Sequence, residues 1–260
     1  MIRTTMSVFV CELFCLVTFA AGDSETGLLD QATAAANRGR SAEAVRLASQ
    51  AIDRNPQLAD AFYLRGRERF RLGKVDESVT DFDRYVALKP QVESRQWERG
   101  IAYYYARQYK QGAEQFELYQ TFHDNDVENS VWRYLCMVPT AGVDKARSVM
   151  LPIKDDRRPG MMQVYDLFRG KLEPEHLLIE FHKGNPNAEQ LAGRLFYAYL
   201  YLGLYYESLG NKQQAEKYIK LAANPQLAEN PNLNSYMWAV AHIHKQRLHD
   251  QQTADAEKSP

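Results

Sequence analysis

Three histidines near the carboxyl end have types and spacing that could serve metal chemistry. His242, His244 and His249 lie in one stretch expected to be helical, and His242 and His249, seven residues apart, share a face. A zinc ion would need further ligands converging on the same point. We therefore expect a histidine cluster on a helix surface and no metal site. His176 and Glu180 are also spaced i, i+4, which is more typical of a surface hydrogen bond than of a ligand set.

Catalytic signals are weak along the rest of the chain. Gly22-Asp23-Ser24 is similar to the nucleophile block of one lipase family, but it has no strand–turn–helix context and no later Asp-x-x-His. The sequence contains no G-x-x-x-x-G-K-[ST], no G-x-G-x-x-G, no H-E-x-x-H and no G-x-S-x-G. The sequence predicts no catalytic residue and no cofactor, and hence no enzyme.

The charge balance disfavours two classes of partner. Lys and Arg number 32 against 33 Asp and Glu, a formal net charge of −1. Such a chain has no electrostatic attraction for nucleic acid or for an anionic membrane surface. Apolar residues at 45% and charged residues at 25% are typical of globular proteins, which argues against wholesale disorder and against a polytopic membrane protein.

The first residues have the profile of a signal peptide. Arg3 precedes an apolar run from Met6 to Ala21, which Glu12 interrupts and which is shorter than the roughly 20 apolar residues that span a bilayer. We expect residues 1–22 to be a signal peptide and the protein to be exported, periplasmic or secreted. Retention of this segment as an anchor is the alternative. Cys15 follows a phenylalanine, which disfavours lipidation, and cleavage would leave Cys136 as the one cysteine.

The elements that would position any binding site come from a repeat of 34 residues. Four pairs of landmarks share this period: Gly39 and Gly73, Pro56 and Pro90, Gly66 and Gly100, Phe82 and Phe116. A fixed period of this length predicts a solenoid, in which stacked units bury a core that no single unit could bury alone.

At these residues the sequence resembles the tetratricopeptide repeat family. Clear units start at Ala59, Glu93 and Phe196, and a weaker one starts near Glu25. The resemblance implies an all-α solenoid of about five to six antiparallel helix pairs. Small residues at motif positions 8, 20 and 27 allow close helix contact, glycine at the turn tolerates a positive φ, and proline near position 32 stops the second helix.

We expect the repeat domain to cover residues 23–250. The pattern degenerates at about 127–195, where Pro139 and Pro152 should break the helices and where two short helices are expected within 161–195. Asn232 to Leu248 reads as a single helix that caps the solenoid. Residues 251–260 are polar and aperiodic, and they are predicted to be a disordered tail.

The resemblance also implies a binding groove. In such repeats the first helix of each pair lines the concave side, and motif positions 5, 9, 12 and 13 face inward. Tyr, Trp and Arg are frequent at energetic hot spots, so this groove would suit a peptide or helix. Each of these aromatic residues could instead pack between helices. The selected residues are Tyr63, Arg67, Phe70, Arg71, Trp97, Ile101, Tyr104 and Tyr105.

The order of the pieces is similar to that of the NlpI family of exported bacterial tetratricopeptide lipoproteins. The segments concerned are RGIAYYYARQY at 99–109, VWRYL at 131–135, YDLFRGKLEPEHL at 165–177 and the stretch 196–222. This resemblance implies an envelope adaptor that dimerises and presents a client to a protease or a cell-wall enzyme. We therefore expect a protein or peptide partner. The alternative is a self-assembling structural homodimer without a separate client.

Overall fold

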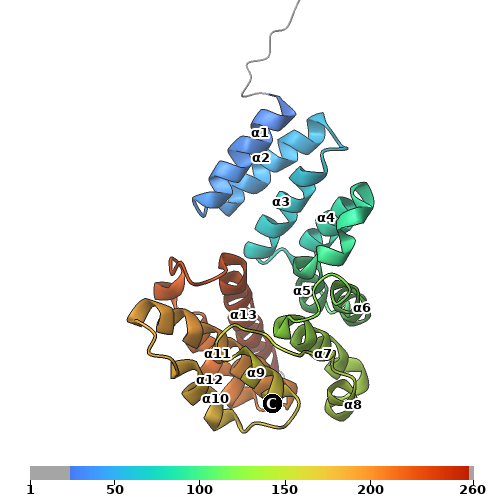
Figure 1. Ribbon diagram of the computed structural model, residues 1–260. Helices are drawn as coiled ribbons and strands as arrows, with labels where there is room; N and C mark the ends of the chain where they lie inside the picture. Colours follow the sequence, from blue (N-terminus) through green and yellow to red (C-terminus); the bar gives the residue numbers. More distant parts are fainter. Residues whose placement is uncertain (1–23, 258–260) are drawn as a thin grey trace, which may run out of the picture.

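The computed structural model describes residues 24–257, and every regular element in this range is a helix. Within these residues, six helix pairs follow one another and a single long helix comes last, which confirms the predicted all-α solenoid with a closing helix (Figure 1). The pairs are α1 (Glu25–Asn37) with α2 (Ser41–Arg54), α3 (Ala59–Arg71) with α4 (Val75–Leu88), α5 (Trp97–Tyr105) with α6 (Tyr109–Tyr119), α7 (Val127–Ala141) with α8 (Val143–Ser148), α9 (Met161–Phe168) with α10 (Pro174–His182), and α11 (Ala188–Ser208) with α12 (Lys212–Ala222). The closing helix is α13 (Ser235–Glu257), and short 3-10 helices lie at Pro90–Arg95 (η2) and Pro225–Leu227 (η3).

Close contact within the pairs depends on the small residues of the repeat. A Cβ atom added at Gly100 would lie 2.7 Å from the Phe116 ring, and one at Gly203 would lie 2.6 Å from the Ile219 side chain. Since real Cβ atoms do not approach so closely, glycine at this position lets a large residue of the second helix pack against the backbone of the first.

The turns between paired helices show why glycine recurs there. Gly39, Gly73 and Gly210 have φ angles of 72°, 74° and 76°, as expected for a left-handed residue after a helix. Arg107 lies 34 residues after Gly73 and adopts the same conformation, with φ of 59°. This region costs a residue with a side chain about 1–2 kcal/mol, so the third turn is strained where the others are not.

The degenerate middle contains the two short helices expected there, α9 and α10. Two details of the prediction are wrong. Pro139 does not break α7, which continues to Ala141 and ends at Gly142, where φ is 80°. The helix expected to start at Phe196 begins at Ala188, because Asn187 and Gln190 form a capping box with each other's backbone.

The end of the chain also differs from expectation. Helix α13 continues to Glu257, so residues 251–257 extend the closing helix rather than forming a tail; Gln252 donates to Glu216 of α12 at 2.8 Å. Residues 258–260 and the predicted signal peptide at 1–22 lie outside the described residues. Within residues 24–257 no helix has the length and apolar character needed to cross a bilayer.

The strained third turn yields a test. Arg107→Gly should raise the free energy of unfolding by about 1 kcal/mol, because glycine adopts a positive φ without steric cost. Gly73→Ala, at the equivalent turn, should lower it by a similar amount. Urea unfolding followed by circular dichroism would measure both, and a destabilised Arg107→Gly protein would contradict this account of the turn.

Candidate functional site

The eight residues predicted to form a concave groove come from α3 and α5. Tyr63, Arg67 and Trp97 are half-buried, and so is Arg71. The remaining four are buried: Phe70, Ile101, Tyr104 and Tyr105 are between 0% and 8% exposed. Much of the surface formed by these eight residues therefore does not reach solvent.

Helix α13 covers this inner face. The Tyr236 ring stacks on Phe70 with centroids 4.8 Å apart, and Trp97 meets Tyr236 edge-on at 5.4 Å. The Tyr105 hydroxyl lies 3.0 Å from Nδ1 of His244. In Figure 1, α13 lies inside the curve formed by the other helices. The place expected for a partner helix is thus taken by the chain's own last helix, which corrects the prediction for the four buried residues.

A buried charge set lies beneath the start of α13. Nε of Arg67 is 3.0 Å from Oε1 of Glu98, and the Tyr63 hydroxyl donates to Oε2 of Glu98 at 2.5 Å. The Arg67 guanidinium also lies over the Tyr236 ring, 5.8 Å from its centroid. Burial raises the pKa of Glu98 above its ordinary value, although Arg67 and Tyr63 oppose this shift. These groups neutralise one another inside the fold, so they do not offer charge to a ligand.

A second charge set joins the middle of α13 to α11. Nε2 of His244 is 3.1 Å from Oε2 of Glu207, and Arg247 is 2.9 Å from Oε1 of the same carboxylate. Arg247 also lies over the Tyr104 ring at 5.3 Å. Burial acts to raise the pKa of Glu207, but His244 and Arg247 outweigh it and lower the pKa to about 2. Glu207 is therefore a carboxylate at all ordinary pH values.

The concave side stays open at the amino-terminal end. A cleft of about 690 Å³ separates the turn between α1 and α2 from the start of α13. Its walls include Arg38 from that turn, Arg71 from the end of α3, and Trp238 and His242 from α13. Arg71 is the one predicted groove residue that lines this cleft. Motif positions could not select Trp238 or His242, because the second wall lies outside the repeat pattern.

Comparison with known proteins finds a family match in the first helix pairs. Residues 29–93 match the tetratricopeptide repeat family. This segment is similar to tetratricopeptide repeats. It comprises most of α1 and all of α2 to α4, so the turn and helix that form one wall of the cleft belong to the matched part.

Several solved structures are similar to the chain over most of its length. YrrB, described as a tetratricopeptide repeat protein with an unusual peptide-binding site, shares 13% identity, with 85% of this chain and 93% of YrrB covered and a TM-score of 0.47. MamA shares 14% identity over 82% of this chain and 98% of its own, also with a TM-score of 0.47. A thermophilic tetratricopeptide repeat protein of Thermus thermophilus shares 16% identity over 87% and 99%, with a TM-score of 0.41.

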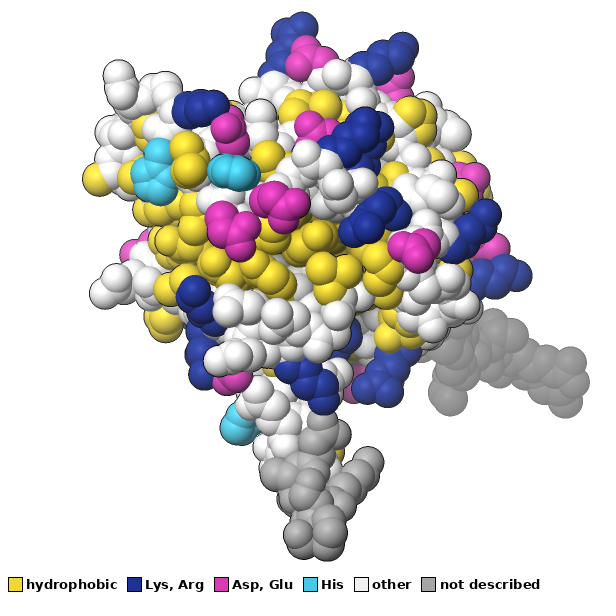
Figure 2. Space-filling model, turned by 90° about the horizontal axis from the view of Figure 1, so that it is seen from below, with side chains coloured by type: hydrophobic (Ala, Val, Ile, Leu, Met, Phe, Trp, Pro, Cys, Tyr) yellow, Lys and Arg dark blue, Asp and Glu magenta, His cyan; other side chains and the backbone are white. Residues whose placement is uncertain are grey.

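The tyrosines separate into buried and accessible groups. Tyr104 and Tyr105 of α5 are buried beneath α13, whereas Tyr199, Tyr206 and Tyr218 of the last pair are half-buried. Tyr218 stacks on Tyr206 at 5.7 Å and on Tyr199 at 6.2 Å. Figure 2 shows a band of hydrophobic side chains between charged ones on the underside of the molecule.

The histidines of α13 do not converge. His242 is exposed and stacks on Trp238 at 4.8 Å, while His244 is buried against Tyr105 and Glu207. No group of three or more possible metal ligands exists among the residues that the structure describes. On α10, Glu180 pairs with Lys183 at 2.7 Å and no bond to His176 is present within this described helix.

The Glu207 contacts predict a pH dependence of stability. Because the folded-state pKa lies near 2, below the unfolded value of 4.5, this group adds stability above pH 4.5 that is lost as the pH falls through 2. At neutral pH the contribution is roughly 3 kcal/mol. Glu207→Gln should therefore flatten the acid limb of the unfolding free energy between pH 5 and pH 2. Glu114→Gln, at a carboxylate that is 63% exposed on α6, is the matched control; equal flattening by both would refute the assignment.

Proposed function

We propose that the chain is a non-catalytic protein–protein interaction scaffold that holds a segment of a client in the cleft between the tetratricopeptide repeats and α13. The observation that supports this most directly is the size and position of the cleft, about 690 Å³ on the concave side of the matched segment. Aromatic and arginine side chains line the cleft, and such side chains supply much of the binding energy of protein interfaces.

The charge of the cleft favours a client segment with an acidic side chain beside an apolar one. Arg38 is exposed and forms no ion pair within residues 24–257, and Arg71 pairs with the buried Glu68 at 3.2 Å. Among the described residues that line the cleft, Glu229 is the single acidic one. An incoming carboxylate would meet Arg38 while its apolar neighbour packs on Trp238, whose indole N–H is held by the Asn224 carbonyl at 3.3 Å.

The location that fits this role is the exported space. The apolar run up to Ala21 supports cleavage and export, and the resemblance in segment order to NlpI-type lipoproteins supports presentation of a client to a protease or cell-wall enzyme. A second candidate is self-assembly into a homodimer, which the half-buried tyrosines of α11 and α12 favour, because a partly accessible aromatic strip suits a symmetric contact.

Site-specific photocrosslinking tests the cleft. With p-benzoylphenylalanine in place of Asn37 or His242, on opposite walls, we expect both positions to capture the same protein in intact cells. The control is Lys110, 85% exposed on α6 and away from the cleft. Arg38→Glu should reduce capture at both cleft positions at least about tenfold, because charge reversal opposes an acidic segment.

Two other outcomes of this experiment would point to a different interface. Capture of a second copy of the chain would favour the homodimer. Equal capture from Lys110 and from the cleft positions would show that the client docks elsewhere.

Export is tested by the mass of the mature protein. We expect a protein purified from the producing cells to begin at or near Asp23, with Arg3 and both Cys11 and Cys15 removed. An intact amino terminus at Met1 would show that the segment is retained. It would contradict the proposal that the protein is exported with cleavage of this segment.

A further inference from the structure

An inner cavity of about 220 Å³ lies where α5, α6, α7, α11 and α13 meet. Its walls are strongly aromatic, with the side chains Trp97, Phe116, Tyr119, Trp132 and Tyr197. Met237 of α13 and Asn234 just before it close one side of the cavity.

Two buried polar atoms on the walls have no partner. Trp132 is 1% exposed and Asn129 is 3% exposed, and both line the cavity. Nε1 of Trp132 and Oδ1 of Asn129 make no hydrogen bond with any described residue. The Asn129 amide is oriented by Nδ2, which donates to Gln120 at 2.8 Å. Since buried polar groups are normally satisfied, one unpaired donor and one unpaired acceptor indicate a missing polar guest.

Carboxylates outnumber basic groups around the cavity. Asp126 and Glu128 line it, and Asp156 lies behind them. Arg158 bonds to all three, with distances of 2.6 Å to Asp126 and 2.5 Å to Asp156. One guanidinium thus faces three carboxylates, and the other basic group nearby is the exposed His123, 4.0 Å from Asp126. A positively charged guest would offset the remaining negative charge.

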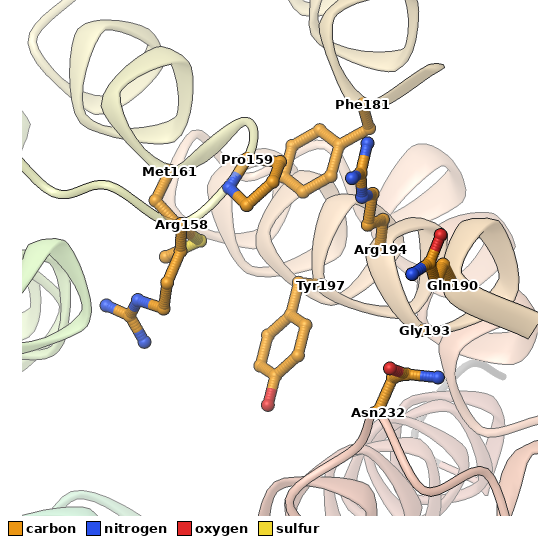
Figure 3. A pocket seen from close by; sticks show the side chains of 9 residues that line it. All are labelled: Arg158, Pro159, Met161, Phe181, Gln190, Gly193, Arg194, Tyr197 and Asn232. Atoms are coloured by element: carbon orange, nitrogen blue, oxygen red, sulfur yellow. The ribbon is translucent and has the colours of Figure 1, made fainter. Parts of the chain in front are cut away.

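A wider outer cavity adjoins this inner one. It measures about 320 Å³ and shares Arg158 and Tyr197 with the inner cavity. Figure 3 shows these two side chains on one side of the outer cavity, with Phe181, Arg194 and Gln190 around the remainder. The two cavities therefore meet at Tyr197 and Arg158.

We propose that the inner cavity binds a small organic cation, a primary ammonium carrying a hydroxyl or carbonyl oxygen a few bonds away. The ammonium lies against the faces of Trp97 and Trp132 and donates to Asn129, where aromatic rings and carboxylates both favour positive charge. The oxygen accepts the indole N–H of Trp132. This assignment concerns a site separate from the client cleft, so either can fail without the other.

A matched pair of ligands tests the proposal on the unaltered protein. Ethanolammonium and ethylene glycol differ by one ammonium in place of a hydroxyl. We expect ethanolammonium to bind with a Kd below about 5 mM at low ionic strength, within the range that four heavy atoms allow. Ethylene glycol should bind at least about tenfold more weakly. Calorimetry would measure both, and intrinsic fluorescence would locate the event, since two of the three tryptophans line the cavity.

Two variants complete the test. Glu128→Gln should weaken ethanolammonium at least about tenfold, and Glu117→Gln, 63% exposed on the outside of α6, should leave the affinity unchanged. Circular dichroism and thermal unfolding would verify that the variants fold. Trp132→Phe, which removes the unpaired N–H and keeps an aromatic face, provides a second measurement and should also weaken binding.

The proposal is overturned by absence of any calorimetric or fluorescence response to ethanolammonium, which would show that the cavity holds only water. Equal affinity for ethylene glycol would also overturn it, because the ammonium would then contribute nothing.

Discussion

The packing of α13 against the inner face of α3 and α5 is the contact on which the rest of the structure depends. A curved row of helix pairs buries the surfaces between neighbours but leaves its concave side apolar. Phe70, Ile101 and Tyr104 belong to that side, and Tyr236 and Val240 of α13 cover it. Without α13 these side chains would form an exposed hydrophobic patch of a size that soluble proteins avoid.

This packing divides the chain into a closed and an open part. One hydrophobic cluster extends from Phe70 to Leu248 and contains α13, while a smaller one, from Leu28 to Tyr85, is built by the first two pairs alone. The first pair therefore keeps its concave side uncovered, and the cleft appears at the boundary. The candidate docking site and the internal cavity both arise from where α13 begins and what it seals.

The sequence predicted the helix pairs but not the packing of α13 over their inner face. A period of 34 residues, with Gly73 at a turn and Gly100 at a close contact, follows directly from helix geometry, so the solenoid and its inner face could be foreseen. Motif positions say which side chains point inward. They do not say what lies against them, because α13 is outside the repeat and its partners are more than 130 residues away in the chain, as with Tyr105 and His244. Helix α11 starts earlier than predicted because Asn187 and Gln190 form a capping box. The 34-residue period did not indicate this local signal.

The polar groups beneath α13 explain why this helix has one position rather than several. An apolar helix on an apolar face could slide by a turn at small cost, since one hydrophobic contact replaces another. His244 and Arg247 of α13 pair with Glu207, and His244 also bonds to Tyr105, so a shift of one turn would leave Glu207 with poorer partners inside the fold. A buried carboxylate without its cation is far more costly than a displaced methyl group. The charges therefore fix the register of α13, and with it the position of Trp238 at the cleft and of Met237 at the cavity wall.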